Sequence, residues 1–141
     1  MADTAARPAS WEALLEAQST QVSAAARALE GLISEELPGV VVDFDPGNRL
    51  LAFGRSMNMR DLLFALIPHA GWVNLQLADG AVLPDQGGLI EGTGKRIRHV
   101  KVRSAAAAAD PKVRSIVRTQ IALGAPEASS GVPRRARAPL P

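Results

Sequence analysis

Cysteine is absent from this chain of 141 residues, and so is tyrosine. Without cysteine the protein has no disulfide, no thiolate nucleophile and no thiolate-ligated zinc or iron–sulfur centre. No stretch approaches the ~20 apolar residues that a membrane-spanning helix needs, and the first ten residues lack the basic-then-apolar layout of a secretory signal. We therefore expect a cytoplasmic protein that does not cross a membrane.

Charge is unevenly distributed along the chain, although the net charge is only +2. Residues 1–45 carry eight acids and two arginines, a net −6, whereas residues 95–141 carry eleven Lys or Arg and two acids, a net +9. This asymmetry favours a charged ligand or partner. Part of the positive charge belongs to residues 125–141, which are rich in proline and arginine, have no apolar period and are expected to be disordered.

Helical patterns mark the two ends of the predicted domain. Ser10 is placed to cap one long first helix, which Pro38–Gly39 ends. Asp110 and Pro111 predict the start of a last helix, and Gly124 is placed to end it. The first helix has a single stripe that is polar at one position only, formed by Trp11, Leu15, Gln18, Val22, Ala25, Leu29 and Leu32.

Between the two helices the sequence predicts five strands. Apolar and polar residues alternate in most of them, while 61–67 is a continuous apolar run typical of a central strand. Pro46–Asn48 is a turn that joins the first two strands in a hairpin, and a long connection from Ala78 to Lys95 precedes the last one. The predicted strands are 40–45, 49–54, 61–67, 71–77 and 97–103.

This order of elements predicts an α+β fold, a two-layer sandwich. The N- and C-terminal helices pack on one face of an antiparallel sheet of about five strands, and the other face stays open. The expected organisation is a disordered N-terminus at 1–9, one domain at 10–124 and a disordered tail at 125–141.

Two dense blocks carry the most specific motifs, "HAGWVNLQLADGAVLPD" from His69 and "IEGTGKRIRHVKVRS" from Ile90. They resemble the YdhG-like family of small bacterial domains of unknown function, over roughly residues 38–123. This chain resembles the branch that lacks the Trp-Gly-x-Pro motif of the first hairpin. The resemblance implies a fold similar to frataxin, and an intracellular iron-chaperone role has been proposed within the family.

The open sheet face is the predicted binding surface. Period-two alternation places Trp72 and Asn74 on one face of the fourth strand, and His99, Lys101 and Arg103 on one face of the fifth. An indole among amides and cations suits a small anionic ligand or a protein partner. Nucleic acid is less favoured, because the chain has only two Trp and three Phe for base stacking. The predicted ligand-binding residues are Trp72, Asn74, Gly92, Thr93, Gly94, Lys95, Arg98, His99, Lys101 and Arg103.

Each part of this surface also has a purely structural interpretation. The cations of the fifth strand suit a solvated, ion-paired sheet face, and the 78–95 connection is long enough to cover Trp72. The Gly92–Lys95 loop is not a phosphate-binding P-loop, because Leu89 stands where glycine is needed and Arg96 where Ser or Thr is needed. The loop is either a weak anion nest or a tight turn.

Metal binding and catalysis have less support in the sequence. A frataxin-like iron site would use a set of acids, since carboxylates bind iron or divalent ions weakly, but a solvated helix end and turn is the alternative. No nucleophile elbow, cysteine or paired carboxylate indicates an enzyme, and no cofactor is predicted apart from iron under this alternative. We expect a non-enzymatic domain that binds a ligand on its open face, with iron binding as the alternative. The acids of the alternative are Glu30, Glu35, Glu36, Asp43 and Asp45.

Overall fold

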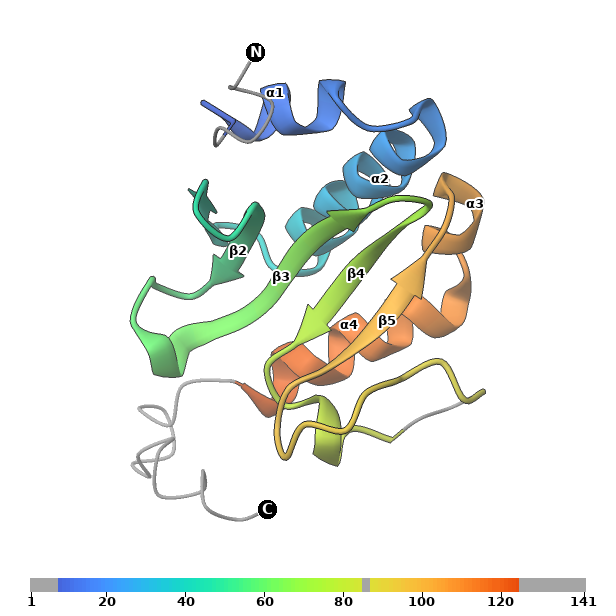
Figure 1. The fold of residues 1–141 in the computed structure, drawn as a ribbon. Coiled ribbons are helices and arrows are strands. Elements are labelled where there is room, and N and C mark those ends of the chain that lie inside the picture. Colours follow the sequence, from blue (N-terminus) through green and yellow to red (C-terminus); the bar gives the residue numbers. More distant parts are fainter. Residues whose placement is uncertain (1–7, 85–86, 125–141) are drawn as a thin grey trace.

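The structure is a computed structural model that describes residues 8–84 and 87–124. It contains one antiparallel sheet in the order β1-β2-β3-β4-β5, with helices on one side (Figure 1). The predicted α+β two-layer sandwich is confirmed. Most of the predicted N-terminal and all of the C-terminal disordered segment lie outside the described residues. The helices are α1 (Trp11–Glu16), α2 (Thr20–Glu36), α3 (Ala105–Ala108) and α4 (Pro111–Leu123). The strands are β1 (Val41–Asp45), β2 (Leu50–Gly54), β3 (Leu62–His69), β4 (Trp72–Leu77) and β5 (Arg98–Val102).

The two faces of the sheet differ because side chains alternate along each strand. The residues of β4 that face the helices are fully buried, whereas those on the open face are half-buried. The first set is Val73, Leu75 and Leu77, and the second is Trp72, Asn74 and Gln76. The apolar face packs against Ala25, Leu29 and Ile33 of α2 and Val113, Ile116 and Val117 of α4, which form one buried core with it. This core fixes which face of the sheet is left open.

The prediction of a single first helix is wrong. The chain forms α1 and α2 with a break at residues 17–19, where Ser19 caps α2 by accepting a hydrogen bond from the Val22 N–H at 3.1 Å. Gln18, the polar position of the stripe, donates from its amide to the Leu14 carbonyl at 3.1 Å. The local capping groups therefore interrupt the helix, and α1 brings Trp11 against Phe44 of β1 with ring centroids 6.2 Å apart.

The predicted caps of the other helix ends are confirmed, with one difference in mechanism. Ser10 and Asp110 cap α1 and α4 through their side chains, and Pro111 is the first residue of α4. α4 ends at Gly124 as expected, but this glycine has φ −88° and not the left-handed conformation. A Cβ there would come too close to Leu63 Cδ2, so the Leu63 side chain would have to shift to accept any other residue. The short helix α3, capped by Ser104, was not predicted.

Candidate functional site

The strand register places acidic, small and basic side chains in one row across the open face. Asp43 of β1 lies opposite Ala52, which lies opposite Ala65, then Gln76 and finally His99 of β5. The sheet therefore has a carboxylate at one edge, small side chains at its centre and a basic residue at the other edge. Two alanines side by side leave a hollow where larger side chains would fill the surface.

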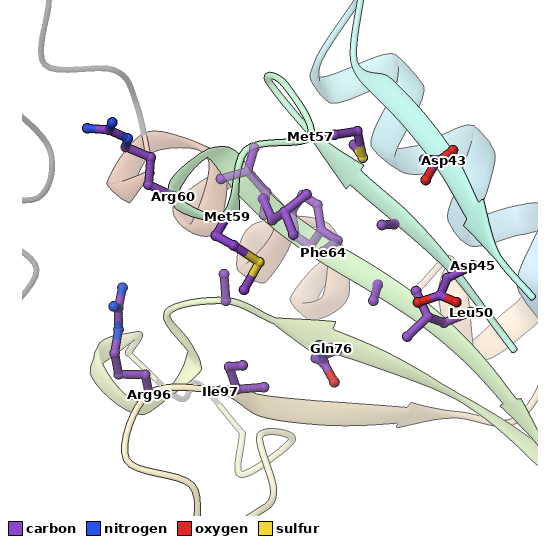
Figure 2. Close-up of a pocket in the computed structure, with 15 residues that line it drawn as sticks. Asp43, Asp45, Leu50, Met57, Met59, Arg60, Phe64, Gln76, Arg96 and Ile97 are labelled. Carbon is purple, nitrogen blue, oxygen red and sulfur yellow. The ribbon is translucent and has the colours of Figure 1, made fainter. Parts of the chain in front are cut away.

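A cavity of about 660 Å³ occupies this hollow. Such a volume falls within the range of small-molecule sites, roughly 300–1,000 Å³. Figure 2 places Arg60 and Arg96 at one end of the cavity, and Asp43 and Asp45 at the other. The apolar residues that line it are Leu50, Ala52, Met57, Met59, Leu62, Leu63, Phe64, Ala65, Ala78 and Ile97, and the polar ones are Asp43, Asp45, Arg60, Gln76 and Arg96. The site is thus largely apolar with opposite charges at its ends.

The connection between β2 and β3 forms one wall of the cavity. Ser56 fixes its shape, because the Ser56 hydroxyl donates to Asp61 Oδ2 at 2.7 Å and accepts from the Asn58 N–H at 3.0 Å. This turn places Met59, a residue that is 85% exposed, and Arg60 at the wall of the cavity. Within residues 8–84 and 87–124, the ion pairs of the structure do not involve Arg60. Arg60 therefore lies exposed at the end of the cavity.

Arg96 is held at the same end of the cavity by a buried polar network. Its Nη2 donates to Asp79 Oδ1 at 2.9 Å, and Asp79 is only 8% exposed. Gln120 of α4, which is fully buried, donates to Asp79 Oδ2 and accepts from the Asp79 N–H, both at 2.8 Å. Because charge-assisted hydrogen bonds of good geometry fix side-chain orientation, the position of Arg96 depends on α4.

The predicted residues around Trp72 are brought together at the other end of β4. Trp72 Nε1 donates to Asn74 Oδ1 at 2.8 Å, and the His69 ring stacks on the indole with centroids 5.1 Å apart. Lys101 Nζ lies 4.7 Å from the Trp72 ring centroid and the Arg103 guanidinium carbon 6.0 Å from it. His69 comes from β3 and the two cations from the β5 side, so neighbours on both sides cover much of the indole.

The cations near Trp72 are partly neutralised. Glu91 Oε1 lies 3.7 Å from Lys101 Nζ and 4.0 Å from His99 Nε2, and the Glu91 backbone pairs with His99 of β5. The 78–95 connection thus supplies a carboxylate at the edge of the basic surface. Contacts with His69, Lys101 and Arg103 account for the half-buried state of Trp72.

The Gly92–Lys95 loop lies outside the cavity lining, which begins with the next residue, Arg96. Gly92 has φ +117°, a conformation that favours glycine, and a Cβ on Gly94 would collide with the Ile97 carbonyl. The Gly94 carbonyl accepts a hydrogen bond from Arg98 Nε at 2.7 Å. These contacts account for both glycines by tight backbone packing.

The acids of the iron hypothesis are not gathered into one site. Glu30 accepts a hydrogen bond from Trp11 Nε1 at 2.7 Å. Glu35 and Glu36 bind Arg114, and Glu36 also accepts from Arg118 at 2.8 Å, which with Arg114 holds the pKa of Glu36 below its ordinary value. Asp43 and Asp45 lie on β1, at the cavity. Among the described residues, no group of three or more His, Asp or Glu is placed to hold a metal ion.

Sequence reasoning found the open face but missed its cavity. The missed residues are chiefly those of the β2–β3 turn and the small pair Ala52 and Ala65. A signal was present, since Ala52 and Ala65 are small residues among larger apolar ones in adjacent predicted strands, and Met57 and Met59 stand in a short polar turn. Only the strand register places the alanines side by side.

Comparison with protein-family models, with curated proteins and with solved structures finds no match for this chain. The resemblance to YdhG-like domains therefore remains a prediction that depends on the "IEGTGKRIRHVKVRS" block. In the part of the chain that the structure describes, no helix is long and apolar enough to cross a membrane.

Proposed function

We propose that this protein is a cytoplasmic, non-enzymatic binding domain of the YdhG-like type. Its open sheet face takes a small amphipathic anion, an apolar body with a carboxylate-like head. The observation that carries this proposal is the cavity of about 660 Å³ with two arginines at one end.

The lining of the cavity supports an apolar ligand body. Ten of its fifteen lining residues are apolar, and Ala52 and Ala65 leave the floor low enough for a ligand chain. Burying apolar ligand surface there is favourable by roughly 25 cal/mol per Å² before the costs of association. Met57 and Met59 have flexible side chains that can adapt to different ligand shapes.

The two arginines support an anionic head. A guanidinium binds carboxylates through paired N–H donors, and Arg96 already has one such partner in Asp79. Arg60 is exposed and available, so the ligand head is placed beside Arg60 with Arg96 adding positive potential. Asp43 and Asp45 at the opposite end repel an anion, which fixes the orientation of the ligand.

Calorimetric titration with decanoate tests the proposal, with decanol and decylamine as probes of matched length. We expect decanoate to bind more tightly than either. Arg60→Glu should weaken decanoate and strengthen decylamine, because it reverses the charge at the head position. Equal affinities for all three probes would contradict the anionic head.

A second pair of variants tests the place of binding. Ala52→Phe fills the floor of the cavity and should abolish measurable decanoate binding without lowering the melting temperature. Ala122→Phe, at an exposed position of α4, is the matched control and should bind like the original protein. Unchanged binding by Ala52→Phe would place the ligand elsewhere.

A further inference from the structure

The acidic end of the cavity has no counterpart in a ligand that carries only an anionic head. Figure 2 shows Asp43 and Asp45 at the end opposite the two arginines. A purely apolar ligand tail would end beside these carboxylates and remove water from them, while offering neither a hydrogen bond nor a charge in return. Desolvating a charged group without giving it a partner is unfavourable. The far end of the cavity therefore suits a ligand that is itself polar there.

Asp43 is the carboxylate that can bind such a polar group. It is exposed on β1, and among the residues that the structure describes none of the ion pairs involves it. Asp45 accepts hydrogen bonds from the Asn48 N–H at 3.2 Å and from Asn48 Nδ2 at 2.8 Å, so the β1–β2 turn already holds it. Alternation along β1 puts both acids on the open face. Asp43 thus offers a charge for binding, and Asp45 adds negative potential beside it.

The strand register gives the distance between the two ends of the cavity. Asp43 pairs with Ala52 and Ala52 with Ala65, so Asp43 lies two strands across from β3 at the level of Ala65. Leu62, at the start of β3, follows the turn that carries Arg60. Two strand spacings of about 4.8 Å and a rise of about 3.3 Å per residue from Leu62 to Ala65 place Asp43 about 14 Å from the start of β3. An extended ligand chain of the length of decanoate spans a distance of this order.

We propose that the ligand of this cavity is a zwitterion, an ω-amino carboxylate whose carboxylate lies beside Arg60 and whose ammonium lies beside Asp43. This inference deepens the proposed function and rests on it, since it names the group at the far end of the same ligand. A terminal ammonium brings three N–H donors and the positive charge that Asp43 lacks. Because Asp43 is exposed, the ammonium keeps part of its hydration and avoids the large cost of burying a charge.

Ligands of equal chain length and different far ends test the proposal by calorimetric titration. The far end is a methyl group in decanoate, a hydroxyl in ω-hydroxydecanoate, a second carboxylate in decanedioate and an ammonium in ω-aminodecanoate. We expect ω-aminodecanoate to bind about two- to fivefold more tightly than ω-hydroxydecanoate, the gain of one exposed ion pair. Decanedioate should bind more weakly than either, because its second carboxylate meets Asp43 and Asp45. Added salt should reduce both differences.

Variants of Asp43 identify the group that binds the ammonium. Asp43→Asn removes the charge at nearly the same size, so ω-aminodecanoate should fall to the affinity of ω-hydroxydecanoate. Decanoate should bind this variant slightly more tightly, because a repelling charge is gone. Asp43→Lys should reverse the order and favour decanedioate over ω-aminodecanoate. Glu16→Gln removes an exposed acid of α1 outside the cavity lining, and as the matched control it should bind all the ligands like the original protein.

Two results would overturn the proposal. ω-Aminodecanoate could bind the original protein no more tightly than ω-hydroxydecanoate does, or its advantage could survive Asp43→Asn. In either case, decanoate binding that is weakened by Arg60→Glu would leave the proposed function standing and only this inference lost. If decanoate and ω-aminodecanoate both fail to bind, or bind unchanged after Arg60→Glu, the anionic head is wrong and both proposals are lost together.

Discussion

The two faces of the sheet are built from the same strands but differ in burial, because helices cover one face and leave the other open. On β4, Val73, Leu75 and Leu77 are completely buried under the helices, while the residues between them stay half-exposed beside the cavity and Trp72. Stability should therefore depend on the strand residues that face the helices, and binding on the alternate residues that lie on the open face. The comparison predicts that substitutions on the two faces separate these properties.

The largest effect is expected on the covered face. Leu29→Ala removes a fully buried side chain of α2 from the core and should lower the free energy of unfolding by about 2–5 kcal/mol. Urea denaturation followed by circular dichroism measures the change. A loss below about half a kcal/mol would mean that α2 does not pack on the sheet through this stripe.

A smaller loss is expected where α4 meets the cavity end of β4. Gln120→Leu withdraws the acceptor of the buried Asp79 N–H and one donor to its carboxylate, which should cost about 1–3 kcal/mol. The same urea experiment measures it, with Thr119→Val on the neighbouring half-buried position as the control. Gln120→Leu should also weaken decanoate binding, because Asp79, which holds Arg96, loses the two hydrogen bonds that orient it. Unchanged affinity for decanoate would show that the hydrogen bonds among Arg96, Asp79 and Gln120 stabilise the fold without contributing to binding.

The ion pairs between α2 and α4 should make stability depend on pH. Arg118 and Arg114 lower the pKa of Glu36 in the folded protein, so the unfolded chain takes up its proton at a higher pH than the folded one. This contribution is fully present above the ordinary carboxyl pKa and is lost as pH falls through the folded value. Glu36→Gln should therefore lower the melting temperature at neutral pH, and the difference should shrink in acid. A difference that grows as pH falls would mean that the pKa of Glu36 is raised, and not lowered, in the folded protein.

The smallest stability effect is expected on the open face at Trp72. Lys101→Ala and Arg103→Ala should each change the free energy of unfolding by only ~0–1 kcal/mol, because partly exposed charges contribute little. If this end of the face binds an anionic ligand or partner, both changes should weaken that binding, and added salt should weaken it further. A large drop in melting temperature would show that the surface is an internal ion-pair network and not a site.

The sequence was sufficient for the fold because its patterns were local. Alternation in residues 71–77 and the caps at Ser10 and Asp110 each depend on neighbouring residues, and the structure contains all of them. The break at Ser19 was missed because an apolar stripe can continue in register across two helices. In residues 11–36 the apolar stripe favoured one continuous helix, whereas the Ser19 cap favoured the start of a second one. The cap determined where α2 begins.

The candidate site was less accessible to sequence reasoning because it depends on register and on distant contacts. Grouping Trp72 with Lys101 and Arg103 needed only alternation in two strands, and the structure brings these residues together. The cavity needed Ala52 opposite Ala65, and a guanidinium held by Asp79, which is bound in turn by Gln120, 41 residues further along the chain. No local pattern reports either. The role of the predicted ligand-binding residues stays a prediction that the variants above can test.

The strand order β1-β2-β3-β4-β5 also has a consequence for how this chain reaches its fold. Every strand pairs with its neighbour in the sequence, so the sheet has a low contact order for a β structure and its hairpins can form early. The bonds from α4 reach much further, from Gln120 to Asp79 and from Arg114 to Glu36. We expect α4 to dock last, so that the Arg96 end of the cavity takes shape only in the final step of folding.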